Sequence, residues 1–245
     1  MKVIGVIPAR YHSTRLPGKP LADINGKPMI QHVYENTAHS SMLDEIIVAT
    51  DDKRVIEAVE NFGGKAQMTS KDHSTGTDRV AEVAAKLDVR IVVNIQGDEP
   101  FINPGMIDEI VTPLLKDEDI PMSTLKHEIT EEEDLNNPNV VKVVTDSADF
   151  ALYFSRSLIP YPRYTENHHA YEHIGIYAYR KDFLLRFSGL CPTGLEETEA
   201  LEQLRALENG YRIKVILTKQ DYIPLSVDTP GDLEKARGYA RNFKG

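Results

Sequence analysis

The sequence lacks several features that define common protein classes. It contains one cysteine, Cys191, which excludes an intramolecular disulfide and is typical of a protein in the reducing cytoplasm. No apolar run approaches the ~20 residues that a transmembrane helix requires. The first residues show no basic segment ahead of an apolar stretch, so we expect no signal peptide. These absences predict a cytoplasmic protein with no membrane insertion.

Positive charge is scarce in this chain. The 28 Lys and Arg residues are outnumbered by 38 Asp and Glu residues, which gives a formal net charge of −10. Nucleic-acid-binding proteins usually have the opposite balance, so we expect no nucleic-acid partner. Three of the cations nevertheless lie in one loop: Arg10, Arg15 and Lys19. An acidic protein with one local basic loop is typical of a site for a small anionic ligand.

Two common nucleotide-binding motifs are also absent. The sequence contains neither G-x-x-x-x-G-K-[ST] nor G-x-G-x-x-G, so it supports neither P-loop ATPase nor dinucleotide oxidoreductase chemistry. It has no internal repeat and no low-complexity linker. We therefore predict one domain, 1–245, made of a nucleotide-binding half, 1–120, and a second half, 121–245.

The first half alternates apolar runs with helical patterns. Continuous apolar runs at 3–7, 46–50 and 90–95 predict strands that are buried on both faces. This pattern is typical of an α/β protein with a mostly parallel central sheet covered by helices.

The rhythm changes after residue 120 and predicts a smaller mixed-sheet subdomain. We expect paired strands at 140–145 and 150–155 and a further strand at 173–179. Residues 195–208 predict one helix, with leucines on its apolar face and Asn209-Gly210 as its stop.

The loop after the first strand carries the strongest chemical signal. A buried strand leads into residues 8–20, where three cations accompany Ser13 and Gly18. Such a loop at the carboxyl edge of a parallel sheet is a common way to hold phosphates. The alternative is an ordinary solvated loop.

Carboxylates at two other strand ends are candidate metal ligands. Asp98 follows a buried strand and a glycine, and Asp228 precedes the last predicted helix. Mg²⁺ prefers one or two carboxylates together with phosphate oxygens and water. The alternative is that each aspartate only caps the helix that follows it.

Three further polar groups leave two interpretations open. Residues 74–79 open a helix, which fits ordinary capping as well as base or ribose binding. His173, Tyr177 and Tyr179 share one strand face, which either lines a pocket or packs on a neighbour. The polar side chains at 202–205 either line a site or form a solvated helix face.

These residues belong to motifs with a recognisable family resemblance. The motifs lie at 7–20, 48–51, 74–79, 94–100, 151–156, 173–177, 201–205 and 227–230. Over nearly its whole length the chain resembles the 3-deoxy-manno-octulosonate (Kdo) cytidylyltransferases, also called CMP-Kdo synthetases. The first motif indicates a sugar nucleotidyltransferase, and the motifs of the second half favour the Kdo branch over the sialate cytidylyltransferases.

The resemblance implies a fold, a reaction and an assembly. The fold would be the Rossmann-like nucleotide-diphospho-sugar transferase fold, with a second half that binds sugar and forms a homodimer. The reaction would join CTP and Kdo into CMP-Kdo and diphosphate, with Mg²⁺ as cofactor, for lipopolysaccharide biosynthesis in a Gram-negative bacterium.

The resemblance also implies roles for individual residues. The nucleotide would be bound by Pro8, Ala9, Arg10, Ser13, Lys19, Ser74, Gly76 and Arg79. The catalytic residues would be Arg10, Lys19, Asp98 and Asp228, of which Asp98 and Asp228 would hold the metal. The sugar would be bound by Gln96, Arg156, His173, Tyr177, Glu202 and Gln203.

Two positions depart from the family pattern, and two other functions stay open. His12 stands where a small residue is usual, and Gly231 where an acidic residue is usual. One alternative function is a cytidylyltransferase for another acid sugar, such as the 8-amino analogue of Kdo or a sialic acid. A single hydrogen bond from residues 161–172 would suffice to select the substituent. The other alternative is a non-catalytic nucleotide-sugar sensor.

Overall fold

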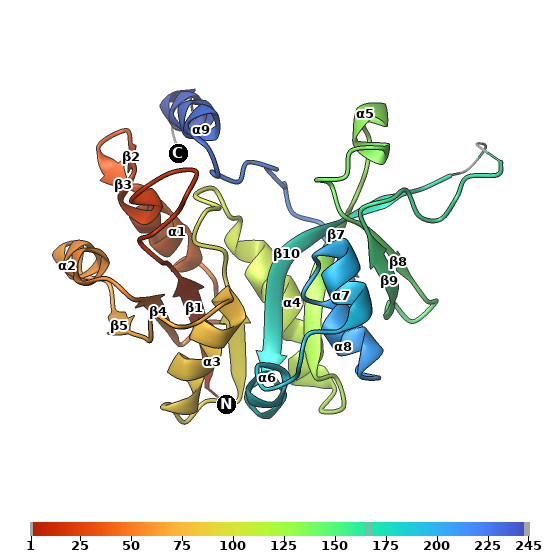
Figure 1. Cartoon of the computed structure of the whole chain (residues 1–245), viewed down its shortest axis with the longest axis horizontal. Coiled ribbons are helices and arrows are strands. Elements are labelled where there is room, and N and C mark those ends of the chain that lie inside the picture. The colour runs from red at the N-terminus through yellow and green to blue at the C-terminus, as the bar shows by residue number, and fades with distance from the viewer. Residues whose placement is uncertain (1, 165, 167, 243–245) are drawn as a thin grey trace. The chain divides into compact units, whose positions relative to one another are not determined.

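The chain forms two compact units in a computed structural model that describes residues 2–164, 166 and 168–242 (Figure 1). The first unit extends to Asp108 and resumes at Gln220, and the second is Glu109–Lys219. These bounds differ from the predicted halves 1–120 and 121–245. The difference arises because the C-terminal segment returns to the first unit, where the Val227 amide donates to the Asp98 carbonyl over 2.9 Å.

The first unit contains a four-stranded parallel sheet, as the continuous apolar runs predicted. Its strand order is β6-β1-β4-β5. The valine and isoleucine side chains of β1 and β6 are buried. Polar side chains that could contact a ligand therefore follow the ends of these strands. The bounds are β1 Val3–Pro8, β4 Glu45–Thr50, β5 Ala66–Met68 and β6 Ile91–Asn94.

Helices and a short ribbon complete the first unit. The helices are α1 Met29–Thr37, α2 Lys53–Asn61, α3 Gly76–Ala85 and α9 Pro230–Asn242, with the 3₁₀ turn η1 Lys19–Leu21. The ribbon pairs β2 Asp23–Ile24 with β3 Lys27–Pro28. Helix α1 begins at Met29, because Pro28 keeps an extended conformation and pairs with Asp23. Helix α4, Pro104–Lys116, contains the point where the units divide.

The second unit is built on a mixed sheet, as predicted. Strand β7 pairs in parallel with β11 and antiparallel with β10, and β8 pairs antiparallel with β10 and with β9. The strands are β7 Met122–Glu128, β8 Lys142–Thr145, β9 Ala151–Ser155, β10 Tyr171–Arg180 and β11 Ile213–Leu217. The helices are α5 Glu132–Leu135, α6 Lys181–Phe187, α7 Gly194–Glu199 and α8 Leu204–Glu208. Within the described part of the chain, no helix is long and apolar enough to cross a membrane.

The single helix predicted at 195–208 is wrong, because the segment breaks at Ala200. This alanine ends α7 in the left-handed region, with φ of 51° and ψ of 50°. The next helix, α8, begins only at Leu204. A left-handed alanine costs roughly 1–2 kcal/mol, so the break is held by interactions outside the local sequence.

We expect Ala200→Gly to raise the free energy of unfolding by roughly 0.5–1 kcal/mol, because glycine adopts positive φ without a Cβ clash. Urea denaturation followed by circular dichroism measures the change. The matched control, Ala206→Gly, lies inside α8 and should lower stability by about 1 kcal/mol. Loss of stability in both variants would contradict a left-handed Ala200.

Candidate active site

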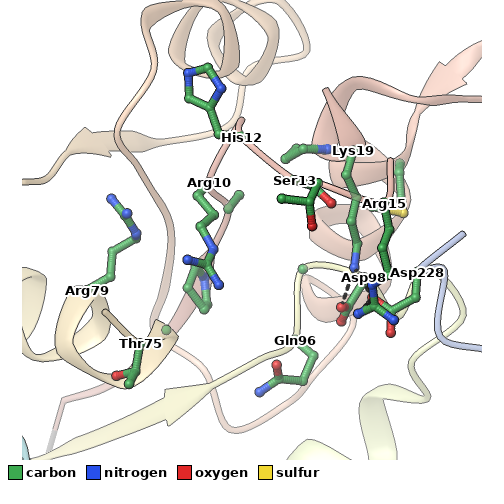
Figure 2. A pocket seen from close by; sticks show the side chains of 17 residues that line it. Arg10, His12, Ser13, Arg15, Lys19, Thr75, Arg79, Gln96, Asp98 and Asp228 are labelled. Carbon is green, nitrogen blue, oxygen red and sulfur yellow. Dashed lines mark hydrogen bonds and ion pairs between the residues drawn. The ribbon is translucent and has the colours of Figure 1, made fainter. Parts of the chain in front are cut away.

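A cavity of about 530 Å³ opens in the first unit, beyond the carboxyl ends of β1 and β6 (Figure 2). Its walls are the loop that follows β1, the start of α3, residues 96–98 and Asp228. The loop after β1 and residues 96–98 follow strand ends where the sequence predicted a ligand site, whereas Asp228, expected at a strand end, lies in the irregular segment before α9. The structure therefore brings together Arg10, Ser13, Lys19, Gly76, Arg79, Gln96, Asp98 and Asp228.

The cavity combines three sources of positive potential. Arg10 and Arg15 line it and are well exposed, and Lys19 lies deeper, with 14% of its side chain exposed. The N-terminus of α3 adds the positive end of a helix dipole at Gly76, which also lines the cavity. This arrangement suits a multiply charged anion such as a polyphosphate.

Lys19 bridges the two predicted metal ligands. Its Nζ lies 2.6 Å from Asp98 Oδ2 and 2.8 Å from Asp228 Oδ1. Arg15 Nη2 also reaches Asp228 Oδ1, at 3.2 Å. Burial alone would lower the pKa of Lys19, but the charges and hydrogen bonds of the two aspartates outweigh it and raise that pKa above its ordinary value. Lys19 is therefore a firmly charged ammonium.

Neither aspartate caps a helix, so the capping alternative is wrong for both. At α4 the Asn103 Oδ1 accepts from the Gly105 amide over 2.9 Å. At α9 the Thr229 hydroxyl accepts from the Asp232 amide, while the Asp232 carboxylate accepts from Thr229 N at 3.0 Å. The carboxylates of Asp98 and Asp228 are left to face cations.

The carboxylate pair fits a magnesium ion bound together with phosphates. Both oxygens already lie within 2.8 Å of one cationic atom, Lys19 Nζ. Among the described residues there is no cluster of three or more His, Cys, Asp or Glu side chains that would hold a metal without a substrate. Two hard oxygen donors are what Mg²⁺ takes from a protein when a nucleotide supplies the rest.

Close backbone packing shapes the loop after β1. Gly18 has φ of +69°, and its amide donates to the Tyr11 carbonyl over 3.2 Å. A Cβ at Gly97 would lie 2.7 Å from the Pro8 carbonyl oxygen, so only glycine fits there. The Cζ atom of Arg54, in α2, lies 3.5 Å from the centroid of the Tyr11 ring, and this cation–π contact stabilises the loop.

His12, the unusual residue of this loop, packs against the neighbouring Tyr11. Its ring lies edge-on to Tyr11, with ring centroids 5.7 Å apart, and its side chain lines the cavity (Figure 2).

The segment before α3 acts chiefly as a helix cap. Thr75 accepts from the Asp78 amide over 3.1 Å, and Asp78 accepts from the Thr75 amide over 3.2 Å. Ser74 donates to the same carboxylate. Thr75 and Gly76 line the cavity, whereas Ser74 is not part of its lining. The residue predicted to bind the nucleotide, Ser74, thus lies next to Thr75, which lines the cavity.

Arg79 lines the cavity but is tied into the protein. It is 2% exposed, its Nη2 lies 3.1 Å from Asp51 Oδ2, and its Nη1 donates to the Thr69 hydroxyl and the Ser70 carbonyl. Asp51 Oδ1 accepts from the Tyr11 amide over 3.4 Å. Through Asp51, Arg79 therefore connects the start of α3 to the loop that follows β1.

Glu99 is a site neighbour that sequence reasoning missed. Its removal from solvent, together with the negative charge of Asp98, raises its pKa to about 8. Near pH 7 this carboxyl is mainly protonated, so it adds little negative charge next to Asp98. In the sequence, its position directly after Asp98 indicates that it lies close to the cavity.

A second polar cluster lies in the second unit, on β10. His173 Nε2 lies 3.0 Å from Thr124 Oγ1, and its ring is 5.4 Å from that of Tyr177. Burial lowers the pKa of His173 to about 3, so its imidazole is neutral. Burial and the nearby charge of Glu202 raise the pKa of Tyr177. Tyr179, by contrast, stacks on Phe183 and Phe187 in the core.

The polar side chains at 202–205 do not form a solvated helix face. Gln203 and Arg205 are each only 5% exposed. Gln203 Nε2 is buried with no hydrogen-bond partner within the described residues. An unpaired buried amide costs about 1–3 kcal/mol, which a ligand oxygen would relieve.

Arg156, predicted to bind the sugar, makes several hydrogen bonds to the backbone. Its guanidinium donates to the carbonyls of Glu199, Pro138 and Ala200, at 2.7, 2.9 and 3.3 Å. These hydrogen bonds commit the side chain to the backbone around the break between α7 and α8. Of the predicted sugar-binding set, Gln96 belongs to the first unit and the other five residues to the second.

Comparison with known proteins identifies the family. The sequence profile described as "Cytidylyltransferase" matches residues 4–214. The 3-deoxy-manno-octulosonate cytidylyltransferase of Geotalea uraniireducens is 57% identical, over 96% of this chain and 97% of its own. The chain belongs to the 3-deoxy-manno-octulosonate cytidylyltransferase family. This confirms the resemblance predicted from the motifs and, with it, a nucleotidyltransferase.

Other members of the family and two solved structures agree. The 3-deoxy-manno-octulosonate cytidylyltransferase of Fusobacterium nucleatum is 51% identical over 98% of both chains. A solved CMP:2-keto-3-deoxy-manno-octonic acid synthetase complexed with CTP is 48% identical, covers 99% of both chains and has a TM-score of 0.95. A cytidylyltransferase from Leptospira borgpetersenii, 18% identical with a TM-score of 0.67, shares the fold. The predicted fold class is thereby confirmed.

The buried histidine of the second unit predicts a pH dependence of stability. The ordinary pKa of 6.5 falls to about 3 in the folded protein, so between these values the unfolded state binds the extra proton and acid favours unfolding. His173 should therefore contribute a loss of about 2 kcal/mol between pH 7 and pH 5. Urea denaturation at pH 7, 6 and 5 should show a shallower decline for His173→Gln than for the wild type.

A control separates the imidazole from its surroundings. Thr124→Val removes the hydroxyl next to His173 but keeps the histidine, so it should lower stability at every pH and retain the wild-type slope. Equal slopes in the wild type and His173→Gln would show that His173 titrates normally.

Proposed function

We propose that this protein transfers CMP from CTP to Kdo, releasing CMP-Kdo and diphosphate for lipopolysaccharide biosynthesis. The observation that carries the proposal is the cavity, lined also by Arg10, in which Lys19 pairs with the carboxylates of Asp98 and Asp228. That combination suits a nucleoside triphosphate with its metal. The names of the relatives supply the substrates, CTP and the eight-carbon sugar acid.

The nucleotide is assigned to the lining of this cavity. Arg10, Ser13 and Lys19 hold the triphosphate, since two cations and a hydroxyl converge there. The cytidine is placed near the start of α3, where Gly76 faces the cavity and Arg79 fixes the helix. The remaining predicted contacts are Pro8, Ala9 and Ser74.

Magnesium is assigned to Asp98 and Asp228. Nucleotidyltransferases of this family typically use a divalent metal, and two carboxylate oxygens are the donors that Mg²⁺ prefers beside phosphates. When bound, the ion supplies positive charge that offsets the negative charge on the triphosphate.

The reaction requires positioning and charge neutralisation more than a strong acid or base. A sugar hydroxyl attacks the α-phosphorus in line, and diphosphate leaves. Arg10 and Lys19 offset the charge that grows on the leaving diphosphate. Lys19 is suited to this role because its raised pKa keeps it charged.

The sugar acid is assigned to Gln96 and to the polar cluster of the second unit. Neutral His173, protonated Tyr177 and the unpaired amide of Gln203 present groups that bind hydroxyls. Glu202 adds one acceptor. Within residues 161–172, which we associate with the far end of the sugar, positions 165 and 167 lie outside the described residues.

We also propose a cytoplasmic homodimer. The free, exposed Cys191 fits a reducing compartment. Large apolar side chains are exposed on β9 and the segment after it, with Leu152 62%, Tyr161 84% and Tyr164 77% exposed. Such side chains favour burial against a second copy of the chain.

Asp98→Asn should reduce kcat roughly 10²- to 10³-fold, because it removes a charged metal ligand from the cavity. Diphosphate release at several Mg²⁺ concentrations measures the loss, and the far-ultraviolet circular dichroism spectrum should stay unchanged. The matched control Asp88→Asn changes an exposed aspartate outside the cavity and should keep wild-type activity. Near-wild-type turnover of Asp98→Asn at low Mg²⁺ would refute the metal assignment.

A substrate panel tests the proposed reaction. Kdo, its 8-amino analogue and a sialic acid are each combined with CTP or UTP, and diphosphate release is recorded. We expect the highest kcat/KM with Kdo and CTP and no release without Mg²⁺. A preference for another sugar would replace Kdo as the substrate, and binding without turnover would indicate a sensor.

A further inference from the structure

The turn between α7 and α8 carries two residues assigned to the sugar. It runs from the left-handed Ala200 through Glu202 and Gln203 to the start of α8 at Leu204. Its local hydrogen bonds are short in range: the Leu201 amide donates to the Glu196 carbonyl, and the amides of Leu204, Arg205 and Ala206 donate to the carbonyls of Leu201, Glu202 and Gln203. Helices as short as α7 and α8 do not persist by themselves, so the turn needs external support.

One support is a buried ion pair that spans the turn. Arg205, in α8, donates to both carboxylate oxygens of Glu196, in the first turn of α7, with Nε at 2.7 Å and Nη2 at 2.5 Å. Only 7% of the Arg205 side chain and 13% of the Glu196 side chain are exposed. Bidentate geometry fixes orientation as well as distance, so this pair sets how the two helices meet.

The second support fastens the turn to β9. The Glu199 carboxylate accepts from the Ser155 hydroxyl at 2.7 Å and from the Arg156 amide at 2.9 Å. In return, the Arg156 guanidinium donates to the carbonyls of Glu199 and Ala200. These contacts hold the backbone at the residue where it turns left-handed.

Both supports end next to side chains that suit a ligand. The negative charge of Glu202 acts on Tyr177 of β10 and helps to raise its pKa. The Nε2 atom of Gln203 is buried and has no hydrogen-bond partner within the described residues. Such groups bind well only when their own positions are fixed, since an error of about 1 Å can cost 10²-fold in rate.

We propose that Arg205 and Arg156 are positioning residues for the sugar acid: with Glu196 and Glu199 they hold the 200–203 turn so that Glu202 and Gln203 meet the substrate. The proposal rests on the assignment of Glu202 and Gln203 to the sugar in the proposed function. The Arg156 guanidinium, which has five N–H groups, donates one each to the carbonyls of Glu199, Pro138 and Ala200.

The test uses two variants, Arg205→Lys and Arg156→Lys. Lysine keeps the positive charge but cannot form the bidentate contact that Arg205 makes with Glu196. Steady-state kinetics should show KM for Kdo raised about tenfold or more, with KM for CTP within twofold of wild type, because the nucleotide cavity is lined by the first unit alone. Glu196→Gln should show the same split and serves if Arg205→Lys fails to fold. The matched control is Arg212→Lys, an exposed arginine of the same unit.

Three kinds of result separate failure of the inference from failure of the proposed function. Equal rises in both KM values, or a lower Tm with both KM values unchanged, would show that the arginines act only on stability and overturn the inference. Absence of turnover by the wild type would instead refute the proposed reaction. An unchanged KM for Kdo in Gln203→Ala would refute the sugar assignment on which the inference depends.

Discussion

The first unit is organised by the need to neutralise two carboxylates that share one site. Asp98 and Asp228 come from distant parts of the sequence, and their oxygens both lie within 2.8 Å of Lys19 Nζ. Two like charges this close are tolerated only with a cation between or beside them. The return of the C-terminal segment to the first unit, the raised pKa of Lys19 and the fit to a metal–nucleotide pair all follow from this constraint.

The polar clusters of the two units differ in their electrostatics. The cavity of the first unit holds permanent charges, which suits phosphates and a divalent ion. The cluster on β10 is kept mainly neutral, because burial prevents protonation of His173 and ionisation of Tyr177. Neutral donors and acceptors suit the hydroxyls of a sugar, for which full charges would add desolvation cost without a matching gain.

Local sequence signals predicted the features that depend on local physics. Continuous apolar runs identified the parallel strands, and the polar residues that follow them identified the edge where the cavity lies. Asp98 lies just beyond the end of β6, as predicted, whereas Asp228 lies far beyond the end of β11 at Leu217, in the irregular segment that returns to the first unit. Ser74 was predicted to bind the nucleotide but does not line the cavity. Its hydroxyl donates to the Asp78 carboxylate, and Thr75 and Gly76 line the cavity instead. The roles assigned to these residues stay predictions.

The helix expected at 195–208 failed for a reason that no local pattern contains. Leucine spacing and helix propensity both favour continuation through Ala200, since alanine is the best helix former. The break is maintained by Arg205 with Glu196 and by Arg156 with Glu199, two pairs whose partners are identified only once the fold is known. The break keeps Glu202 and Gln203 out of a regular helix, and these are the residues assigned to the sugar in the proposed function. The departure from propensity at Ala200 is therefore held by one buried ion pair, Arg205 with Glu196, and by hydrogen bonds between Arg156 and Glu199 that involve the backbone.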